Sequence, residues 1–274
     1  AVGLNSASFN LGRVFGPAIA GLLIEVAGTG PVFLLNAVSF GAVILALRRM
    51  DPRALNPAPR TARGRGQIRE GVRYLRGRPD LLTVMGLVFF VATFGLNFQL
   101  TIALMATTVF DRGAGQFGLL GSVMAVGSLS GALLAARRGR PRLRLLLLAA
   151  LGFGLVEVLS GLMPTYVLFA AVLVPVGVTA LTFITAANAT IQLGSDPMMR
   201  GRVMALYTAV FFGGTPLGAP LIGAIAEAYG PRWSLVVGGL VSAAAAVVAA
   251  AILARTRGVR IPVRSRGVRI PAHR

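Results

Sequence analysis

The sequence predicts an all-α membrane protein, a polytopic helical bundle with about eight transmembrane helices. Of its 274 residues, 55% are apolar and only 13% are charged, whereas about 25% are charged in an ordinary soluble domain. Apolar runs close to the ~20 residues that a helix needs to cross a bilayer follow one another along the chain. The arginines gather in alternate connections between these runs, which is typical of a multi-pass membrane protein.

The composition also excludes several kinds of site. The chain contains no cysteine and a single histidine, His273, so we expect no metal site, and no motif points to a cofactor. A soluble protein with a net charge of +19 would suggest a nucleic-acid partner. Because the arginines flank apolar runs, we expect a membrane instead of nucleic acid. No catalytic constellation is present, and we expect no enzyme.

Eight apolar runs are the candidate membrane spans. Within them, Arg13 and three glutamates are the only charged residues. Glycine and proline recur in the runs, and transmembrane helices tolerate both residues better than soluble helices do. The runs lie near residues 4–27, 32–47, 82–109, 115–136, 145–162, 165–193, 203–228 and 233–254.

The arginines divide the connections into two sets. Twenty-four of the 27 basic residues, all of them arginines, lie in alternate connections and in the C-terminal tail, and the remaining connections hold only Arg112 and Arg232. The positive-inside rule therefore places both termini of this chain in the cytoplasm. Anionic lipids are the expected partners of the arginine-rich loops.

An internal repeat relates the first span to the seventh. With an offset of 202 residues, residues 1–28 align with residues 203–230 without a gap. Because the repeat unit contains six spans, an even number, both copies run in the same direction. The identical pairs are Leu4/Leu206, Ala7/Ala209, Phe9/Phe211, Gly12/Gly214, Gly16/Gly218, Gly21/Gly223, Glu25/Glu227 and Gly28/Gly230.

Three segments carry a resemblance to the major facilitator superfamily, and more narrowly to its branch of bacterial transmembrane secretion effectors that includes the enterobactin exporter. Residues 199–207 resemble the entry to helix eleven of that branch, and residues 94–99 resemble its helix seven. Residues 5–17 resemble the antiporter motif of helix five, G-x-x-x-G-P-x-x-G-G. The motif residues present are Gly12, Gly16, Pro17 and Gly21, with Ala20 in place of one glycine.

This resemblance implies a 12-helix fold of two parallel six-helix repeats. We then expect an N-terminally truncated chain that holds helices five to twelve and lacks its own first four helices. Within the linker, Ile68, Val72 and Leu75 predict an amphipathic helix over Gln67 to Arg78 on the inner membrane surface. The expected parts are the last two helices of the first half (1–50), a cytoplasmic linker (51–80), the second half (81–254) and a basic cytoplasmic tail (255–274).

Small residues at helical spacing in the two related spans predict close helix packing. Two interpretations overlap: plain packing, and packing that also acts as a gate between the halves. The residues of this motif are Gly12, Gly16, Pro17, Gly21, Gly214, Gly218 and Gly223.

Arg13 lies about nine residues into its span, close to the midplane at ~1.5 Å per residue. A charge at that depth usually faces a cavity or a partner. We expect it to bind an anionic substrate group or to pair with an acid on a missing helix. The alternative is that its side chain reaches back to the cytoplasmic surface.

Glu157 is the one acid deep within a span of the second half, in the outer third of the membrane. It is the candidate for carrying the coupling proton, since an apolar setting favours the protonated form of a carboxyl over its charged form. The alternative is an outer-edge residue that reaches water. Glu25 and Glu227 lie at outer helix ends and are expected to be structural.

Uncharged polar residues predict the wall of a substrate path on helices five, seven, ten and eleven of the resembled fold. Polar groups in lipid must face protein or a water-filled path. Hydrogen bonds between helices are the alternative explanation. With two aromatic residues, the expected path residues besides Arg13 are Asn10, Asn97, Gln99, Thr101, Thr182, Thr185, Asn188, Tyr207 and Phe211.

The resemblance implies a secondary active transporter in a bacterial inner membrane. Its expected activity is proton-coupled export of small amphipathic molecules, such as a drug, siderophore or secondary metabolite, by alternating access. The expected partners are the substrate, protons and the lipid bilayer. An importer or permease of the same superfamily, and an inactive truncated membrane protein, are the alternatives.

Overall fold

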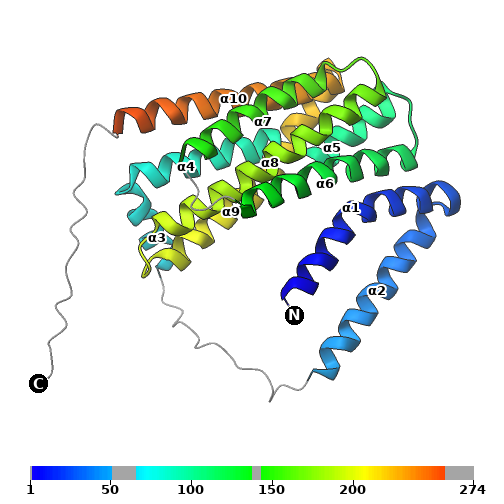
Figure 1. Cartoon of the computed structure of the whole chain (residues 1–274), viewed down its shortest axis with the longest axis horizontal. Coiled ribbons are helices and arrows are strands. Elements are labelled where there is room, and N and C mark those ends of the chain that lie inside the picture. Colours follow the sequence, from blue (N-terminus) through cyan, green and yellow to red (C-terminus); the bar gives the residue numbers. More distant parts are fainter. Residues whose placement is uncertain (1, 51–65, 138–142, 257–274) are drawn as a thin grey trace, which may run out of the picture.

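The computed structural model describes residues 2–50, 66–137 and 143–256, and every regular element in these ranges is a helix (Figure 1). The first helices are α1 (Val2–Ala27), α2 (Thr29–Arg49) and α3 (Gln67–Arg76). The next stretch is divided into α4 (Pro79–Phe90), the π-helical segment η2 (Val91–Gly95), α5 (Phe98–Leu104) and the π-helical segment η3 (Met105–Val109). The remaining helices are α6 (Ala114–Arg137), α7 (Leu143–Gly161), α8 (Tyr166–Gly194), α9 (Arg200–Tyr229) and α10 (Pro231–Thr256).

These elements confirm the predicted fold class. Seven described helical stretches are long and apolar enough to cross a membrane, and Phe15–Ala27 of α1 adds a shorter apolar stretch. The structure differs from the predicted span over 82–109 in two respects: the helix begins at Pro79, and it is interrupted at Leu96 and Asn97. The break places non-helical backbone inside the predicted span, which membrane proteins tolerate where the backbone is buried in protein or lines a cavity.

Helices α4 to α10 form one bundle, in which α7 packs along α10 and α8, and α6 packs along α8 (Figure 1). Glycine sets two of these contacts. A Cβ atom on Gly154 of α7 would lie only 2.5 Å from the carbonyl oxygen of Gly239 in α10, and one on Gly177 of α8 would overlap the carbonyl oxygen of Met124 in α6. The helix pairs can approach this closely because no side chain separates their backbones.

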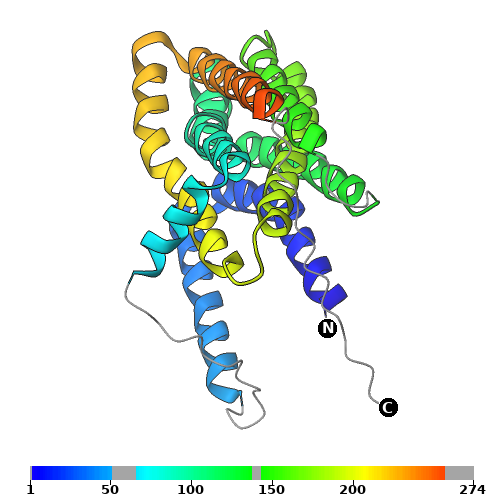
Figure 2. The ribbon, with the colours of Figure 1, turned by 90° about the vertical axis from the view of Figure 1, so that its left-hand side faces the viewer.

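Of the first two helices, only α2 stands apart from this bundle. α1 changes direction along its length and packs against α6, whereas α2 extends away from the bundle in both views (Figures 1 and 2). No residue of α2 is buried. Pro17 removes one backbone hydrogen-bond donor from α1, and the next amide, that of Ala18, donates to Ser122 Oγ of α6 at 3.1 Å.

The repeat seen in the sequence has a local structural counterpart. Gly28 and Gly230 are aligned in the repeat, and each ends the first helix of a pair with a positive φ, +76° and +95°. Glycine adopts this region without the strain that a Cβ atom would cause. The turns from α1 to α2 and from α9 to α10 are therefore built in the same way.

Candidate functional site

The helix that begins at Pro79 is interrupted at its centre. After η2, Leu96 and Asn97 leave the helical conformation with ψ near +35°. The amide of Leu96 donates to the carbonyl oxygen of Val91 at 3.0 Å, five residues earlier. We call Val91–Asn97 the interrupted segment. Such π-type irregularities occur frequently at functional sites.

Side chains within the same helix hold this segment. The Asn97 amide nitrogen donates to the Thr93 carbonyl oxygen at 2.7 Å, and the Thr101 hydroxyl donates to the Asn97 carbonyl oxygen at 3.2 Å. These bonds satisfy backbone acceptors near the break. Within the described chain, Thr93 Oγ1 and Asn97 Oδ1 are buried without a hydrogen-bond partner.

Two adjoining cavities lie beside the interrupted segment. The larger, about 500 Å³, lies between α1, α5 and α6, and the smaller, about 200 Å³, lies between α6, α8 and α9. No charged side chain lines either cavity among the described residues. Both cavities share the lining residues Leu96, Phe98, Met124 and Ser128.

Two of the predicted path residues line these cavities. Gln99 lies on the wall of the larger cavity, and Phe211 lies on the wall of the smaller one together with Phe212 and Thr215. Phe211 also stacks on Tyr207, with ring centroids 6.0 Å apart. Tyr207 is 4% exposed and supports the wall from behind.

The other polar residues bind within the protein instead of facing either cavity. Asn97 and Thr101 are buried at the interrupted segment. On α8, the Thr182 hydroxyl donates to the Val178 carbonyl oxygen and the Thr185 hydroxyl donates to that of Leu181, each at 2.7 Å. Asn188 forms a side-chain hydrogen bond with Tyr207 of α9. The side chains of Asn10 and Arg13 lie outside the described part, although their backbone belongs to α1.

Glu157 is buried in the second half, with 1% of its surface exposed. The alternative that it reaches water at the outer edge is therefore wrong. Its carboxyl lies where α7 meets η2 and α10: a Cβ atom on Gly95 would be 3.0 Å from Oε2, and one on Gly238 would be 3.3 Å from Oε1. Oε2 has no hydrogen-bond partner among the described residues.

The antiporter-like glycines divide into contacting and open positions. Gly21 packs on α6, where its Cβ would lie 2.5 Å from the Ala114 carbonyl oxygen, and the Pro17 carbonyl packs on Gly118. Among the described residues, a Cβ atom on Gly12 or Gly16 would meet nothing within 4 Å. In α9, Gly214 and Gly218 pack on η2, and a Cβ atom on Gly218 would overlap the Thr93 carbonyl oxygen.

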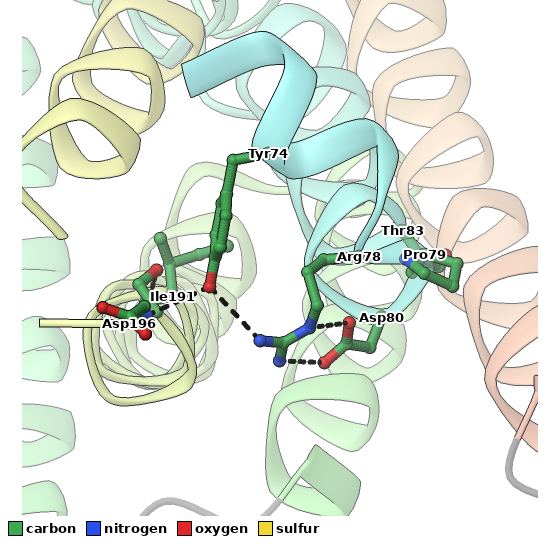
Figure 3. A network of polar contacts seen from close by, with 8 residues as sticks. Tyr74, Arg78, Pro79, Asp80, Thr83, Ile191 and Asp196 are labelled. Carbon is green, nitrogen blue, oxygen red and sulfur yellow. Dashed lines mark hydrogen bonds and ion pairs between the residues drawn. The ribbon is translucent and has the colours of Figure 1, made fainter. Parts of the chain in front are cut away.

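A polar network fixes α3 to the bundle at its basic end, where α3, the start of α4 and the turn between α8 and α9 meet (Figure 3). Arg78 forms a bidentate ion pair with Asp80 at 3.0 and 2.8 Å and donates to the Tyr74 hydroxyl at 3.3 Å. The same hydroxyl accepts the Asp196 amide at 3.0 Å. The hydrogen bond to Asp80 raises the pKa of Arg78, so the guanidinium stays charged.

The predicted amphipathic helix is present as α3, Gln67–Arg76, but its apolar residues divide between two surroundings. Leu75 is buried in the bundle, while Ile68 is 75% exposed. Glu70 pairs with Arg202 of α9 at 2.9 Å. Leu75, one of the three apolar residues of the face that we expected on the membrane surface, therefore packs on protein.

The two arginines at the opposite end have structural contacts. Arg232 donates to the carbonyl oxygens of Gly161 and Met163, and its guanidinium lies 5.7 Å from the centre of the Phe110 ring. Arg112 lies 5.8 Å from the centre of the Tyr166 ring. Both contacts fasten the turns between helices at that end.

The sequence did not point to the interrupted segment or, apart from Phe211, to the apolar lining residues. Leu96, Phe98 and Met124 are ordinary apolar residues of a span, and nothing in their pattern separates cavity wall from core. The signal that could have located the break is Gly95 with Asn97, two poor helix formers within one span.

Comparisons with known proteins agree with this architecture. The chain is 27% identical over 237 residues to the multidrug efflux pump Tap of Mycobacterium tuberculosis, covering 83% of this chain and 55% of the relative. It is 28% identical over 218 residues to the enterobactin exporter EntS of Escherichia coli, covering 78% of this chain and 51% of the relative. The chain thus spans about half the length of the curated relatives that it matches.

The solved structure of a bacterial homologue of the human lysosomal transporter Spinster, inward-facing and unoccupied, matches with a TM-score of 0.53 and 15% identity. The match covers 90% of this chain and 68% of the other and supports the shared fold. The family model described as transmembrane secretion effector matches residues 1–265. With its multi-pass helices and parallel repeat, the chain belongs to the transmembrane secretion effector family of the major facilitator superfamily, a family of transporters and not of enzymes.

Proposed function

We propose that this chain is part of a secondary active transporter that exports small amphipathic molecules across a bacterial inner membrane. The observation that carries this proposal is the pair of mostly apolar cavities beside the interrupted segment. The larger cavity, about 500 Å³, has a size that suits a small organic ligand. The relatives' names, multidrug efflux pump and enterobactin exporter, support export as the direction.

The position of the larger cavity supports alternating access. Pro17, Ala20 and Gly21 of α1 form one wall, and Phe98 and Gln99 of α5 lie on another. α1 belongs to the first copy of the repeat, and α5 to the second. A cavity between two repeats opens to one side or the other when the repeats rock against each other.

Protons are the proposed coupling ion, and Glu157 is the proposed proton carrier. Its carboxyl is buried and Oε2 lacks a partner in the described structure, and a partnerless carboxylate is costly to bury. Arg13 is proposed to bind an anionic substrate group or to pair with an acid elsewhere in the whole protein. The arginine-rich loops support the placement of both ends of this chain in the cytoplasm, beside anionic lipids.

The test is efflux of a fluorescent amphipathic dye from cells that express the whole protein as its gene encodes it. We expect efflux to stop when a protonophore collapses the proton gradient, and to fall at least about tenfold in Arg13→Ala and Glu157→Gln. Glu227→Gln is the matched control, because Glu227 is exposed at a helix end. Dye uptake in place of efflux would instead favour the importer alternative.

Absence of transport for every dye, with the whole protein present in the membrane, would count against broad export. Unchanged efflux in Glu157→Gln, with the protonophore effect intact, would remove Glu157 from the coupling step.

A further inference from the structure

Glu157 lies outside both cavities, on the other side of the interrupted segment. The carboxyl contacts Gly95 from α7, whereas the next residue, Leu96, lines both cavities. Gln99 and Phe98 also line the larger cavity. A short stretch of irregular backbone therefore separates a buried acid from the wall of the proposed substrate path.

The surroundings of this carboxyl contain no charge that would balance it. Ser242 Oγ of α10 lies beside the same point of Gly95, but its hydroxyl donates to the Gly238 carbonyl oxygen at 2.8 Å. η2 has no titratable side chain. In the other helices packed around the acid, the titratable residues are Arg144, Tyr166, Arg232 and Arg255, all at helix ends.

This setting fits a neutral acid better than a carboxylate. An ionised carboxylate without a partner is costly to bury in an apolar interior. When Glu157 releases its proton, the groups around it must supply a hydrogen-bond donor or move apart. The element beside it that can move most easily is the interrupted segment, where the regular i to i−4 hydrogen bonds are broken.

A second contact ties this movement to the cavity wall. Phe153 lies one helical turn before Glu157 on α7 and is fully buried. Its ring contacts Gly95, where a Cβ atom would lie 2.6 Å away, and packs edge-to-face on Phe98 with centroids 5.9 Å apart. The same face of α7 thus contacts the interrupted segment at Gly95 and the first residue of α5 beyond it.

We propose that Glu157 is a proton-binding site outside the substrate path, and that its occupancy sets the conformation of Val91–Asn97 and so the position of Leu96 and Phe98 on the cavity wall. Glu157 acts through the backbone of Gly95 and does not touch the substrate, so it is a positioning residue. This inference rests on the proposed export function and states how a proton would act on the path.

The test reads the cavity wall without any transport step. This chain has no cysteine, so once any cysteine in the rest of the whole protein is replaced by serine, Leu96→Cys accepts a single trifluoromethyl tag, whose fluorine NMR shift is followed against pH. We expect a pH-dependent shift that is lost in Glu157→Gln, with the signal fixed at its acidic position. Glu227→Gln is the matched control and retains the response.

The variant Glu157→Asp guards against misfolding of Glu157→Gln. It keeps a carboxyl one methylene shorter, and we expect it to retain the response with a displaced midpoint. A response that persists in Glu157→Gln, or none in the parent, would overturn the inference. A response to sodium at constant pH, with none to pH, would overturn the proton as the ligand.

The two proposals fail in different ways. A fluorine response without dye efflux would leave this link standing and remove the export function. Proton-driven efflux without a fluorine response would leave export standing and remove the link.

Discussion

The helices α1 and α9 are related by the repeat, yet their matching glycines have opposite surroundings. Gly218 packs so tightly on η2 that a Cβ atom would overlap the Thr93 carbonyl oxygen, whereas its counterpart Gly16 meets nothing within 4 Å. At the outer end the order is reversed. Gly21 packs on the backbone of α6, and Gly223 approaches only a Leu100 methyl group, at 3.8 Å.

This difference shows that the glycines repeated in α1 and α9 do not make the same contacts in the two helices. The same small residues allow α9 to pack on the interrupted segment within its own half and α1 to pack on α6 of the other half. The face of α1 that matches the buried face of α9 is open in the described chain. The variants below test this comparison in order of expected effect, each made in the whole protein.

The largest effect is expected for Gly218→Ala against Gly16→Ala. The new methyl group at position 218 would overlap a backbone oxygen, which cannot move as a flexible side chain does. Overpacking of this kind destabilises by about 1–3 kcal/mol or more. Thermal unfolding of the detergent-purified protein measures it. Equal losses at both positions would mean that the open face of α1 is packed in the whole protein.

For Gly21→Ala against Gly223→Ala we expect the larger loss of stability in α1 instead of α9, with a smaller difference between the two variants. Position 21 meets the Ala114 carbonyl oxygen, while the only neighbour of position 223 is a side-chain methyl group that can shift. We expect Gly21→Ala to destabilise by about 1–2 kcal/mol and to reduce dye efflux, since α1 lines the larger cavity. If Gly223→Ala is the more damaging change, the contact between α1 and α6 does not bear on stability.

The interrupted segment offers a further test of this comparison, because α9 packs on it, whereas α1 packs on α6. Asn97→Ala removes the bond to the Thr93 carbonyl oxygen, and we expect a loss of about 1 kcal/mol, read by the same unfolding measurement. Thr107→Ala is the control, because the Thr107 hydroxyl makes a similar bond to the Ala103 carbonyl oxygen at an exposed position. Equal effects would mean that the break needs no side-chain support.

The smallest effect is expected at the basic end. Glu70→Gln breaks a partly exposed ion pair with Arg202, and such pairs contribute about 0–1 kcal/mol. Tyr74→Phe removes a hydroxyl with two partners, Arg78 and the Asp196 amide, and should cost somewhat more. Protease cleavage between α2 and α3 would report release of α3. Equal cleavage of the two variants and the parent would show that apolar packing at Leu75 suffices.

The sequence predicted the fold well because membrane spans and repeats leave a strong signal. Apolar length, arginine placement and the pairs Gly21/Gly223 and Gly28/Gly230 are properties of the chain itself. Two of the predicted path residues, Gln99 and Phe211, lie on the walls of the two cavities. Thr182 and Thr185 lie on neither wall, and their hydroxyls donate to the carbonyl oxygens four residues earlier, an arrangement that the sequence pattern does not distinguish from a polar path.

The surroundings of Glu157 could not be predicted from one helix. Counting residues along α7 predicted that it lies deep in a span, but its burial depends on η2 and α10, which come together only in the folded bundle. The tight packing of α9 on η2, beside the break at Leu96 and Asn97, likewise exists only in the folded bundle. Contacts between distant segments of this kind carry no local sequence pattern.

The hydroxyls of Thr182 and Thr185, which donate to carbonyl oxygens of their own helix α8, bear on how the proposed transporter would select its substrates. Their hydrogens are already donated to the backbone, so a guest beside Phe211 meets a mostly apolar wall whose described polar side chains are Ser128 and Thr215. Fit alone distinguishes related molecules by only about 1–3 kcal/mol per methylene. In the proposed exporter, such a wall would rank compounds gradually by size and would admit a broad range of substrates.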